Sequence, residues 1–276
     1  MNYLPLIPET DPLAGRIELL FALDGYQPDH PRERVVPDGA IHVIVELDGR
    51  ERFVFDPETG KPRQRCIDAW ISGVHSDHFI IGDTSAGSSL IVAQFAPGHA
   101  GAFLGCDIEA INDRVFAATE LLGDSILQLR KAMLEIDDAA KRLEIFRDYW
   151  AQRYDAQREA PAAIVDAVGA LRADPGATSI DHLCDQVDVS RKHLGALFKR
   201  HVGPTPKRFQ RILRFHRVFA QLQQQQSIDW ATLSLDLGYA DQAHFVRDFV
   251  RFSGLRPQEF LQREEERTNF FPEDER

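Results

Sequence analysis

The strongest constraint on the fold of this 276-residue chain is a helical pattern that occurs twice between residues 179 and 260. Each copy has a short amphipathic helix, a tight turn and a second helix with a polar outer face. In the first copy, Asp188 lies in the turn and Ser190 can cap the second helix. In the second copy, Gly238 ends the first helix and Asp241 can cap the next one. The pattern predicts two helix-turn-helix motifs, whose second helices fit the major groove of DNA.

The first turn of each second helix is where side chains reach base edges in such motifs. Arginine binds guanine bidentately, glutamine suits adenine, and apolar contact with alanine suits the thymine methyl group. The residues predicted to read bases are Arg191, Lys192, His193, Ala240, Gln242, Ala243 and His244. Contacts to phosphates, which position a protein without reading sequence, are predicted for Lys199, Arg200, Lys207 and Arg208.

The distribution of charge favours a nucleic-acid partner, although the whole chain carries a formal net charge of −11. Between residues 190 and 217 there are nine basic residues and no acidic residue. They are Arg191, Lys192, Lys199, Arg200, Lys207, Arg208, Arg211, Arg214 and Arg217. A basic patch inside an acidic protein indicates binding to a polyanion. A merely solvated face is the alternative, and it is less favoured because the run coincides with the helix-turn-helix pattern.

Two spaced motifs extend this pattern to a family resemblance. The second copy reads Gly238-Tyr239-x-Asp241-x-x-x-Phe245-x-Arg247-x-Phe249, followed by Gly254-x-x-Pro257-x-x-Phe260. The first reads Ser190-x-x-x-Leu194-x-x-x-Phe198-Lys199, followed by Gly203-x-x-Pro206 and Phe209. Both resemble the signature of AraC/XylS-type transcriptional regulators. The resemblance implies a double-stranded DNA operator, and RNA polymerase as a partner if the protein is an activator. For Arg247 it implies a phosphate contact or a salt bridge inside the domain.

The N-terminal part has the period of β-strands. Residues 41–47 alternate between apolar and polar, Asp48 and Gly49 predict a hairpin turn, and residues 52–55 begin the return strand. Further strands are predicted at residues 17–23, 66–74, 79–81 and 89–95. Together they predict a β-sandwich or half-barrel. The stretches Pro37-Asp38-Gly39 and Phe95-x-Pro97-Gly98 also resemble, more loosely, an N-terminal domain often fused to AraC-type modules.

A β-rich domain without a catalytic constellation, joined to a DNA-binding module, predicts a sensor of a small effector. The interiors of β-barrels and sandwiches are usual pocket sites. The predicted cavity wall is the apolar face of one strand with two aromatic residues nearby. These residues are Ile41, Val43, Val45, Trp70 and Phe95.

From residue 119 the apolar period becomes helical. A heptad-like seam steps by four and three residues and predicts one helix over residues 122–136. The seam consists of Leu122, Ile126, Leu129, Met133 and Ile136. A second helix carrying Leu143, Phe146, Trp150 and Tyr154 would pair with it as a hairpin. Two interpretations are open: the seam forms a homodimer, or it packs on Phe146 and Trp150 of the same chain.

These patterns predict an α+β chain in four parts. The parts are a β-rich sensor domain at residues 1–118, a helical hairpin and linker at 119–157, an AraC-type double helix-turn-helix domain at 158–262 and an acidic tail at 263–276. There is no apolar run of about 18 residues and no visible signal peptide. The three cysteines lie far apart, which disfavours a disulfide framework. We therefore expect a cytoplasmic protein with no membrane contact.

A second class of function, a cupin-like metal enzyme or a DNA-repair protein carrying a DNA-binding module, is weighed against the regulator. His42, His75, His78 and His99 invite a metal hypothesis. His75 and His78 are three residues apart and would face opposite sides of a strand, and the His-x-His pair usual in such enzymes is absent. Scattered cysteines also disfavour a methyl-acceptor site. No catalytic residue, metal or cofactor is predicted.

Overall fold

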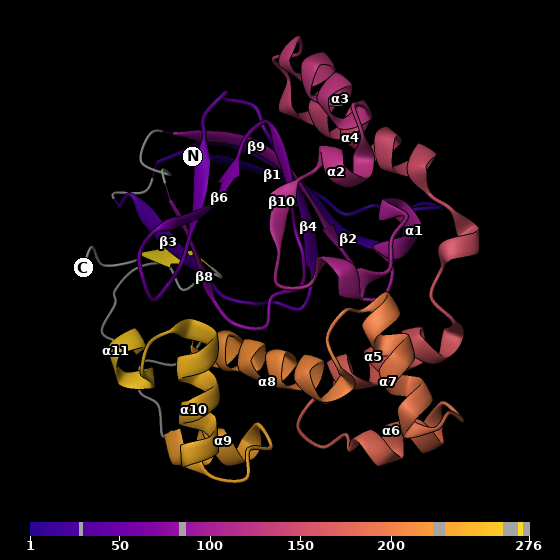
Figure 1. Cartoon of the computed structure of the whole chain (residues 1–276), viewed down its shortest axis with the longest axis vertical. Coiled ribbons are helices and arrows are strands. Elements are labelled where there is room, and N and C mark those ends of the chain that lie inside the picture. The colour runs from indigo at the N-terminus through magenta and orange to yellow at the C-terminus, as the bar shows by residue number, and fades with distance from the viewer. Residues whose placement is uncertain (28–29, 83–86, 223–229, 262–269, 273–276) are drawn as a thin grey trace.

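The computed structural model describes residues 1–27, 30–82, 87–222, 230–261 and 270–272 of the chain. Figure 1 shows two halves: β-strands with flanking helices above, and a layer of helices below. The predicted α+β architecture, with a β-rich N-terminal part and a helical C-terminal part, is confirmed. Among the described helices, none is long and apolar enough to span a bilayer.

The strands form two antiparallel sheets. Sheet A has six strands in the order β1-β2-β9-β4-β7-β10, and sheet B has five in the order β11-β3-β8-β5-β6. The strands of sheet A are β1 (Asn2–Leu6), β2 (Ile17–Tyr26), β9 (Ser88–Phe95), β4 (Ile41–Glu46), β7 (Ala69–Ser72) and β10 (Val115–Ala117). Those of sheet B are β11 (Phe270–Pro272), β3 (Arg32–Val35), β8 (Phe79–Gly82), β5 (Arg52–Phe55) and β6 (Pro62–Cys66). The β-rich N-terminal part expected from the strand spacing is thus present as two antiparallel sheets.

The predicted hairpin at Asp48 and Gly49 is wrong, because β4 and β5 belong to different sheets. The Asp48 carboxylate accepts hydrogen bonds from the Arg50 amide (2.8 Å) and from the Arg52 guanidinium (3.2 Å). These bonds bend the chain so that it crosses from sheet A to sheet B. The predicted strand at 66–74 is also divided into β6 and β7, and Asp68 between them has a left-handed φ of 57°.

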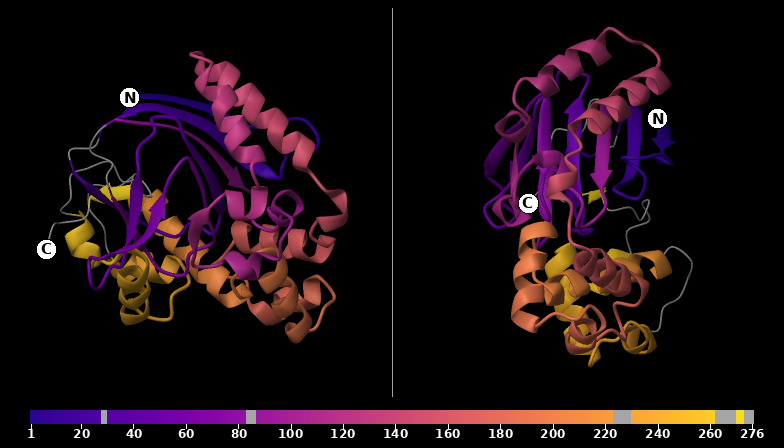
Figure 2. Two further views of the ribbon diagram at one scale, coloured as in Figure 1. Left: turned by 45° about the horizontal axis from the view of Figure 1, so that its top comes forward. Right: turned by 90° about the vertical axis from the view of Figure 1, so that its right-hand side faces the viewer.

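Four helices of the N-terminal half follow the last long strand. They are α1 (Gly101–Leu104), α2 (Thr119–Leu122), α3 (Ser125–Leu134) and α4 (Ala139–Arg153), with a 3-10 turn η1 (Ile108–Ile111) between the first two. Figure 2 shows α3 and α4 side by side against the indigo strands, and α4 contacts β1 and β2. The predicted single helix at 122–136 is wrong, because Gly123 (φ 62°) separates α2 from α3 and Ile136 lies beyond the end of α3.

The seam residues lie inside this chain. Ile126 and Met133 are 0% exposed, and they share one core with Phe146 and Trp150 of α4. Leu129 is 8% exposed in the same core. These seam residues therefore pack against α4 of the same chain, and they are not available to form a dimer surface.

The helical half contains seven helices and a preceding 3-10 turn, η2 (Ala156–Arg158), within the described residues. The helices are α5 (Ala162–Ala173), α6 (Ile180–Gln186), α7 (Arg191–His201), α8 (Pro206–Leu222), α9 (Trp230–Asp236), α10 (Gln242–Ser253) and α11 (Pro257–Leu261). The first motif has its own core, to which α8 contributes Phe209. Further along α8, Ile212, Phe215 and Val218 belong to the core of the second motif, which is continuous with that of the N-terminal half. The linking helix thus joins both motifs through its buried face.

Of the predicted acidic tail at 263–276, only residues 270–272 lie within the described part of the chain. They form β11, which pairs with β3 at the edge of sheet B, Phe270 opposite Val35 and Pro272 opposite Glu33.

Candidate nucleic-acid interface and inter-sheet face

Each recognition helix begins with a side-chain cap. The Ser190 hydroxyl accepts a hydrogen bond from the His193 amide (3.2 Å), and the Asp241 carboxylate accepts one from the His244 amide (2.7 Å). Such caps satisfy amide groups that have no partner within the helix and define its first residue. The predicted start of both α7 and α10 is confirmed. Thr205 caps the start of α8 in the same way, because its hydroxyl accepts a hydrogen bond from the Arg208 amide (3.3 Å).

The residues predicted to read bases lie at these two starts and reach solvent. All are exposed except His244, which is half-buried: Arg191, Lys192, His193, Ala240, Gln242, Ala243 and His244. The Arg191 side chain is 70% exposed and lies 3.5 Å from the Asp181 carboxylate, which is itself exposed. Exposed pairs of this kind are weak and can exchange partners. The base-reading role itself stays a prediction.

The basic run between residues 190 and 217 is not one surface. Arg214 is 5% exposed and donates to the carbonyl oxygens of Pro175 (2.9 Å) and Gly238 (3.0 Å). It thereby ties the linking helix α8 to the loop between α5 and α6 and to the turn of the second motif. Arg211 pairs with Asp248, which is 1% exposed, from α10. These two arginines hold the domain together, a role that sequence reasoning missed because their partners lie far along the chain.

The backbone conformation of the turn in the second motif explains why residue 238 is a glycine. Gly238 has a φ of 73°, a left-handed conformation in which a side chain is strained. A Cβ atom placed there would lie 2.6 Å from the Gly176 carbonyl oxygen. The loop between α5 and α6, just before the first motif, thus approaches the turn of the second motif closely, so the relative position of the two motifs is set by backbone packing as well as by α8.

The cations predicted to contact phosphates lie elsewhere than the reading residues. Lys199 and Arg200, in the last turn of α7, pair with Glu109 (2.9 Å) and Asp107 (3.2 Å) of the N-terminal half. Arg208 lies 3.8 Å from Asp77. Lys207 donates to the Gln210 amide oxygen (3.0 Å). Arg247 is exposed, and the described residues contain no acidic partner within ion-pair distance of it.

The five residues predicted to wall an effector cavity do not face one space. Phe95 lies with Ile41, Val43 and Val45 under the helices, its ring centroid 4.9 Å from that of Trp150. Trp70 lies on the opposite face of sheet A, in a small cluster with residues of sheet B. That prediction is wrong, because alternation identifies the two faces of a strand without saying which one the helices cover.

The face of sheet A that looks toward sheet B has a different character. Ile44 and Leu90 point to this inter-sheet face, and both are half-buried although they lie between two sheets. Leu19, Phe21 and Leu23 of the neighbouring strand β2 lie on the same face of sheet A and are also half-buried. By contrast, Val43 and Val45 on the helix-covered face are 0% exposed. Val92 and Trp70 on the same face are only 4% exposed, so the apolar surface that stays partly accessible is formed by Ile44, Leu90 and the β2 side chains.

The end of this face nearest the helical half is polar. His42 and Gln94 are paired neighbours on it, and the His42 Nε2 atom lies 3.2 Å from the Asp38 carboxylate. Burial alone would lower the pKa of His42, but the Asp38 carboxylate outweighs burial and raises that pKa above its ordinary value. One residue away, the Pro37 carbonyl oxygen accepts a hydrogen bond from His216 of α8 (2.6 Å). A chain of contacts thus runs from the inter-sheet face to the linking helix.

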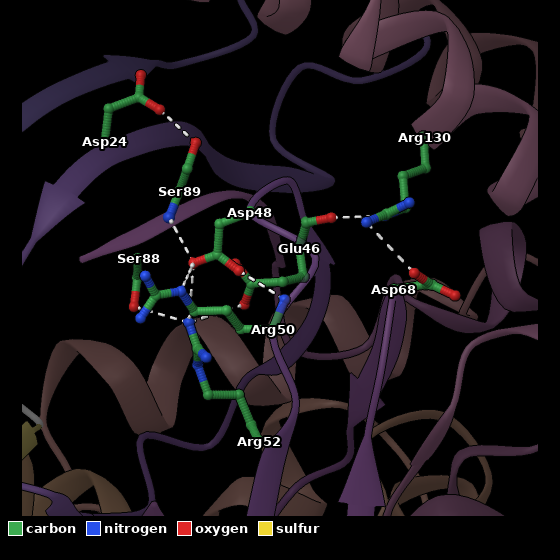
Figure 3. A network of polar contacts seen from close by, with 9 residues as sticks. All are labelled: Asp24, Glu46, Asp48, Arg50, Arg52, Asp68, Ser88, Ser89 and Arg130. Atoms are coloured by element: carbon green, nitrogen blue, oxygen red, sulfur yellow. Dashed lines mark hydrogen bonds and ion pairs between the residues drawn. The ribbon is translucent and has the colours of Figure 1, made fainter. Parts of the chain in front are cut away.

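At the other end of β4, charged side chains form a buried ionic network (Figure 3). The Arg52 guanidinium, 3% exposed, lies 3.3 Å from the Glu46 carboxylate, which is 0% exposed. It also donates to the Ser88 hydroxyl (3.0 Å). From α3, Arg130 donates to the Glu46 carbonyl oxygen (2.6 Å). The network joins three strands to a helix, and burial raises the pKa of Glu46 to about 8.

No group of three or more histidine, cysteine, aspartate or glutamate side chains that could hold a metal occurs among the described residues. His75 bonds the Ser72 hydroxyl (3.0 Å), and burial lowers its pKa to about 4. It is thus a neutral, hydrogen-bonded side chain at neutral pH.

Two family profiles match separate parts of the chain. A family profile described as a helix-turn-helix domain matches residues 183–263. A profile described as a domain of unknown function (DUF6597) matches residues 7–117. An uncharacterized HTH-type transcriptional regulator of Haemophilus influenzae is 30% identical over 82 residues, which are 29% of this chain and 27% of that protein. The chain thus spans about a quarter of the length of this curated relative.

Two solved structures are similar in part. ToxT from Vibrio cholerae aligns with a TM-score of 0.48 and 10% identity over 88% of this chain and 98% of its own. A transcriptional regulator with an AraC-type DNA-binding domain from Chromobacterium violaceum aligns with a TM-score of 0.33 and 28% identity, over 36% of this chain and 89% of its own. The signature residues sit where two capped helix-turn-helix motifs require them, and a helix-turn-helix profile matches the same segment. A helix-turn-helix domain therefore lies at residues 183–263, the segment whose motifs resemble those of AraC/XylS-type transcriptional regulators.

Proposed function

We propose that this protein is a sequence-specific, DNA-binding transcriptional regulator whose N-terminal half senses a small effector. One observation carries the first part: both recognition helices begin at capped ends that present exposed polar side chains on one domain. Because α8 and the Gly176–Gly238 approach hold these ends in one arrangement, they would enter successive major grooves on one DNA face, about 34 Å apart.

The two reading ends should contribute differently to specificity. Arg191→Ala is expected to cost about 1–3 kcal/mol in binding and to relax the preference at one base pair, because a bidentate arginine–guanine contact is lost. Gln242→Ala should lose selectivity at an adenine while the salt dependence stays unchanged. Binding of each variant to a randomised operator pool at two salt concentrations measures both effects. Arg147→Ala, an exposed cation on α4 paired with Asp148, is the matched control and should leave the selected sequence unchanged.

A uniform loss across all sequences for both variants would show that the base-reading residues are wrongly assigned. Failure of the wild-type chain to select any double-stranded sequence would contradict the proposed function as a whole.

The effector is proposed to bind at the inter-sheet face. Support comes from its half-buried apolar side chains and from the polar end at His42 and Gln94. An effector contacting that end would perturb Asp38 and the Pro37–His216 hydrogen bond, and so reach α8. A ligand that binds one arrangement of these contacts better than another would shift the population of the two reading ends.

If the effector binds at this face, an anionic naphthalene dye should bind there too and should lose its signal when the face is made acidic. Leu90→Glu places a carboxylate on the accessible apolar surface and is expected to abolish the fluorescence enhancement of an anionic naphthalene dye, because the dye loses its apolar surface and is repelled. The thermal midpoint should change little, since the site is half-buried. Leu235→Glu, on the 63% exposed Leu235 of α9, is the control and should leave the dye signal intact. Equal signals from both variants would place the dye elsewhere and contradict the site.

A homodimer, and a contact with RNA polymerase if the protein is an activator, remain predictions from the sequence and the family resemblance. The buried seam of α3 does not support a dimer through that surface.

A further inference from the structure

The two recognition helices carry a histidine at the same position. His193 of α7 and His244 of α10 each stand three residues after the capping side chain, and each backbone amide donates to that cap, Ser190 (3.2 Å) or Asp241 (2.7 Å). Side chains at this end of a recognition helix reach base edges in the major groove. The two histidines can therefore be compared directly, because their place in the helix is the same.

The residue one helical turn further on differs between the two motifs. In α10 it is Asp248, whose side chain is 1% exposed, and in α7 it is Leu197, which packs on the core of the first motif. The Nε2 atom of His244 lies 3.8 Å from the Asp248 Oδ2 atom. Residues four apart lie on one face of a helix, so this carboxylate and this imidazole are neighbours by position as well as by charge. The His244 side chain is 31% exposed, so part of it stays open to a ligand.

The Asp248 carboxylate is itself fixed in place. The Arg211 guanidinium of α8 donates to both of its oxygens, from Nε to Oδ2 (3.0 Å) and from Nη2 to Oδ1. The imidazole of His244 also meets the ring of the buried Tyr239 nearly at a right angle (83°), with ring centroids 5.3 Å apart. A carboxylate and an aromatic ring thus define the orientation of His244, whereas His193 is an exposed side chain.

The orientation of the imidazole determines what it offers to a base. An ionised carboxylate only accepts hydrogen bonds, so it favours the proton of a neutral imidazole on the ring nitrogen that faces it. For His244 that nitrogen is Nε2, and Nδ1 is left with a lone pair that accepts a hydrogen bond. In the major groove the donors are the amino groups of adenine and cytosine, whereas guanine presents only acceptors.

We propose that Asp248 is a positioning residue that holds His244 as a hydrogen-bond acceptor for the amino group of an adenine or cytosine in operator DNA. Arg211 supports this role by fixing the Asp248 carboxylate. The second motif thus reads one base pair with a side chain that is oriented before DNA binds. The inference rests on the proposed DNA-binding function and adds the base edge that is read at one position.

Selection from a randomised pool of double-stranded DNA by the full chain tests the proposal. His244→Ala is expected to lose, on the order of tenfold, the preference for adenine or cytosine at one base pair. Asp248→Asn should lose the same preference at the same base pair. In the His244→Ala background it should change the selection no further, because Asp248 acts through His244. Asp148→Asn, which neutralises an exposed carboxylate of α4, is the control and should leave the selection unchanged.

The ring nitrogens of His244 provide a second readout, which a merely structural role of Asp248 would not predict. Proton–nitrogen NMR spectra of the wild-type chain at about pH 8, above the ordinary pKa of histidine, are expected to show the proton on Nε2 and a lone pair on Nδ1. The signal that disappears in His244→Ala assigns the resonance. If Asp248→Asn does not fold, the wild-type spectrum alone decides.

A proton on Nδ1 would overturn the proposal, and so would a guanine preference at the base pair that depends on His244. The same conclusion follows if Asp248→Asn leaves the selection unchanged, or if it relaxes several base pairs whether or not His244 is present. If the wild-type chain selects no DNA sequence at all, the proposed function on which the inference rests fails instead.

Discussion

Leu129→Glu is expected to unfold the N-terminal half or to destabilise it by about 4 kcal/mol or more. Leu129 is 8% exposed and belongs to the core that joins α3 and α4 to sheet A. A carboxylate there would be removed from water without a partner, which is among the most costly single changes in a protein. Urea unfolding followed by circular dichroism measures the free energy of unfolding.

Leu127→Glu is the matched control, because Leu127 is two residues away on the exposed side of the same helix at 36% exposure. Its free energy of unfolding should stay within about 0.5 kcal/mol of the wild type. Size-exclusion chromatography decides between the two interpretations of the seam. A folded Leu129→Glu monomer obtained from a wild-type dimer would show that the seam mediates dimerisation after all.

At about pH 9, above the raised pKa of Glu46, Arg52→Ala is expected to cost about 3–5 kcal/mol of the free energy of unfolding, because it leaves the ionised Glu46 carboxylate buried beside Asp48 without its guanidinium. Arg65→Ala is the control: its pair with Glu51 is exposed, so its loss should cost about 0–1 kcal/mol. Glu46→Gln introduced together with Arg52→Ala should recover much of the loss, since no buried charge then lacks a partner. Equal costs for Arg52→Ala and Arg65→Ala would show that the network does not stabilise the fold.

The same network predicts a dependence of stability on pH. The pKa of Glu46 is raised from its ordinary 4.5 to about 8, so the folded state holds its proton more tightly than the unfolded state does. The corresponding stability is fully present below about pH 4.5 and is lost as the pH rises toward 8. Glu46→Gln cannot titrate and should flatten this decline. A wild-type stability that rises between pH 5 and 8 by as much as that of the variant would contradict the raised pKa.

Local patterns determined the elements and their ends. The caps at Ser190, Thr205 and Asp241 and the glycine at 238 follow from rules that act over a few residues, and the structure confirms them. Alternation along residues 41–46 likewise predicted a strand with two unlike faces. What these patterns could not supply was the identity of the neighbour on each face. The effector wall was therefore assigned to residues that α1 and α4 cover.

The basic residues show the same contrast between what a local sequence pattern predicts and what tertiary contacts decide. A count of basic residues predicted one polyanion-binding run, but Arg211 and Arg214 are taken up by Asp248 and by two backbone carbonyls, and Lys199 and Arg200 by η1 and its flank. These partners lie between 24 and 93 residues away along the chain. The sequence by itself determined the double helix-turn-helix, the β-rich N-terminal half and the residues at the reading ends, because short-range periodicity and capping specify them. Only the tertiary structure decided which face is covered and which cations are already paired, because desolvation and Coulomb interactions depend on distances that long-range packing alone sets.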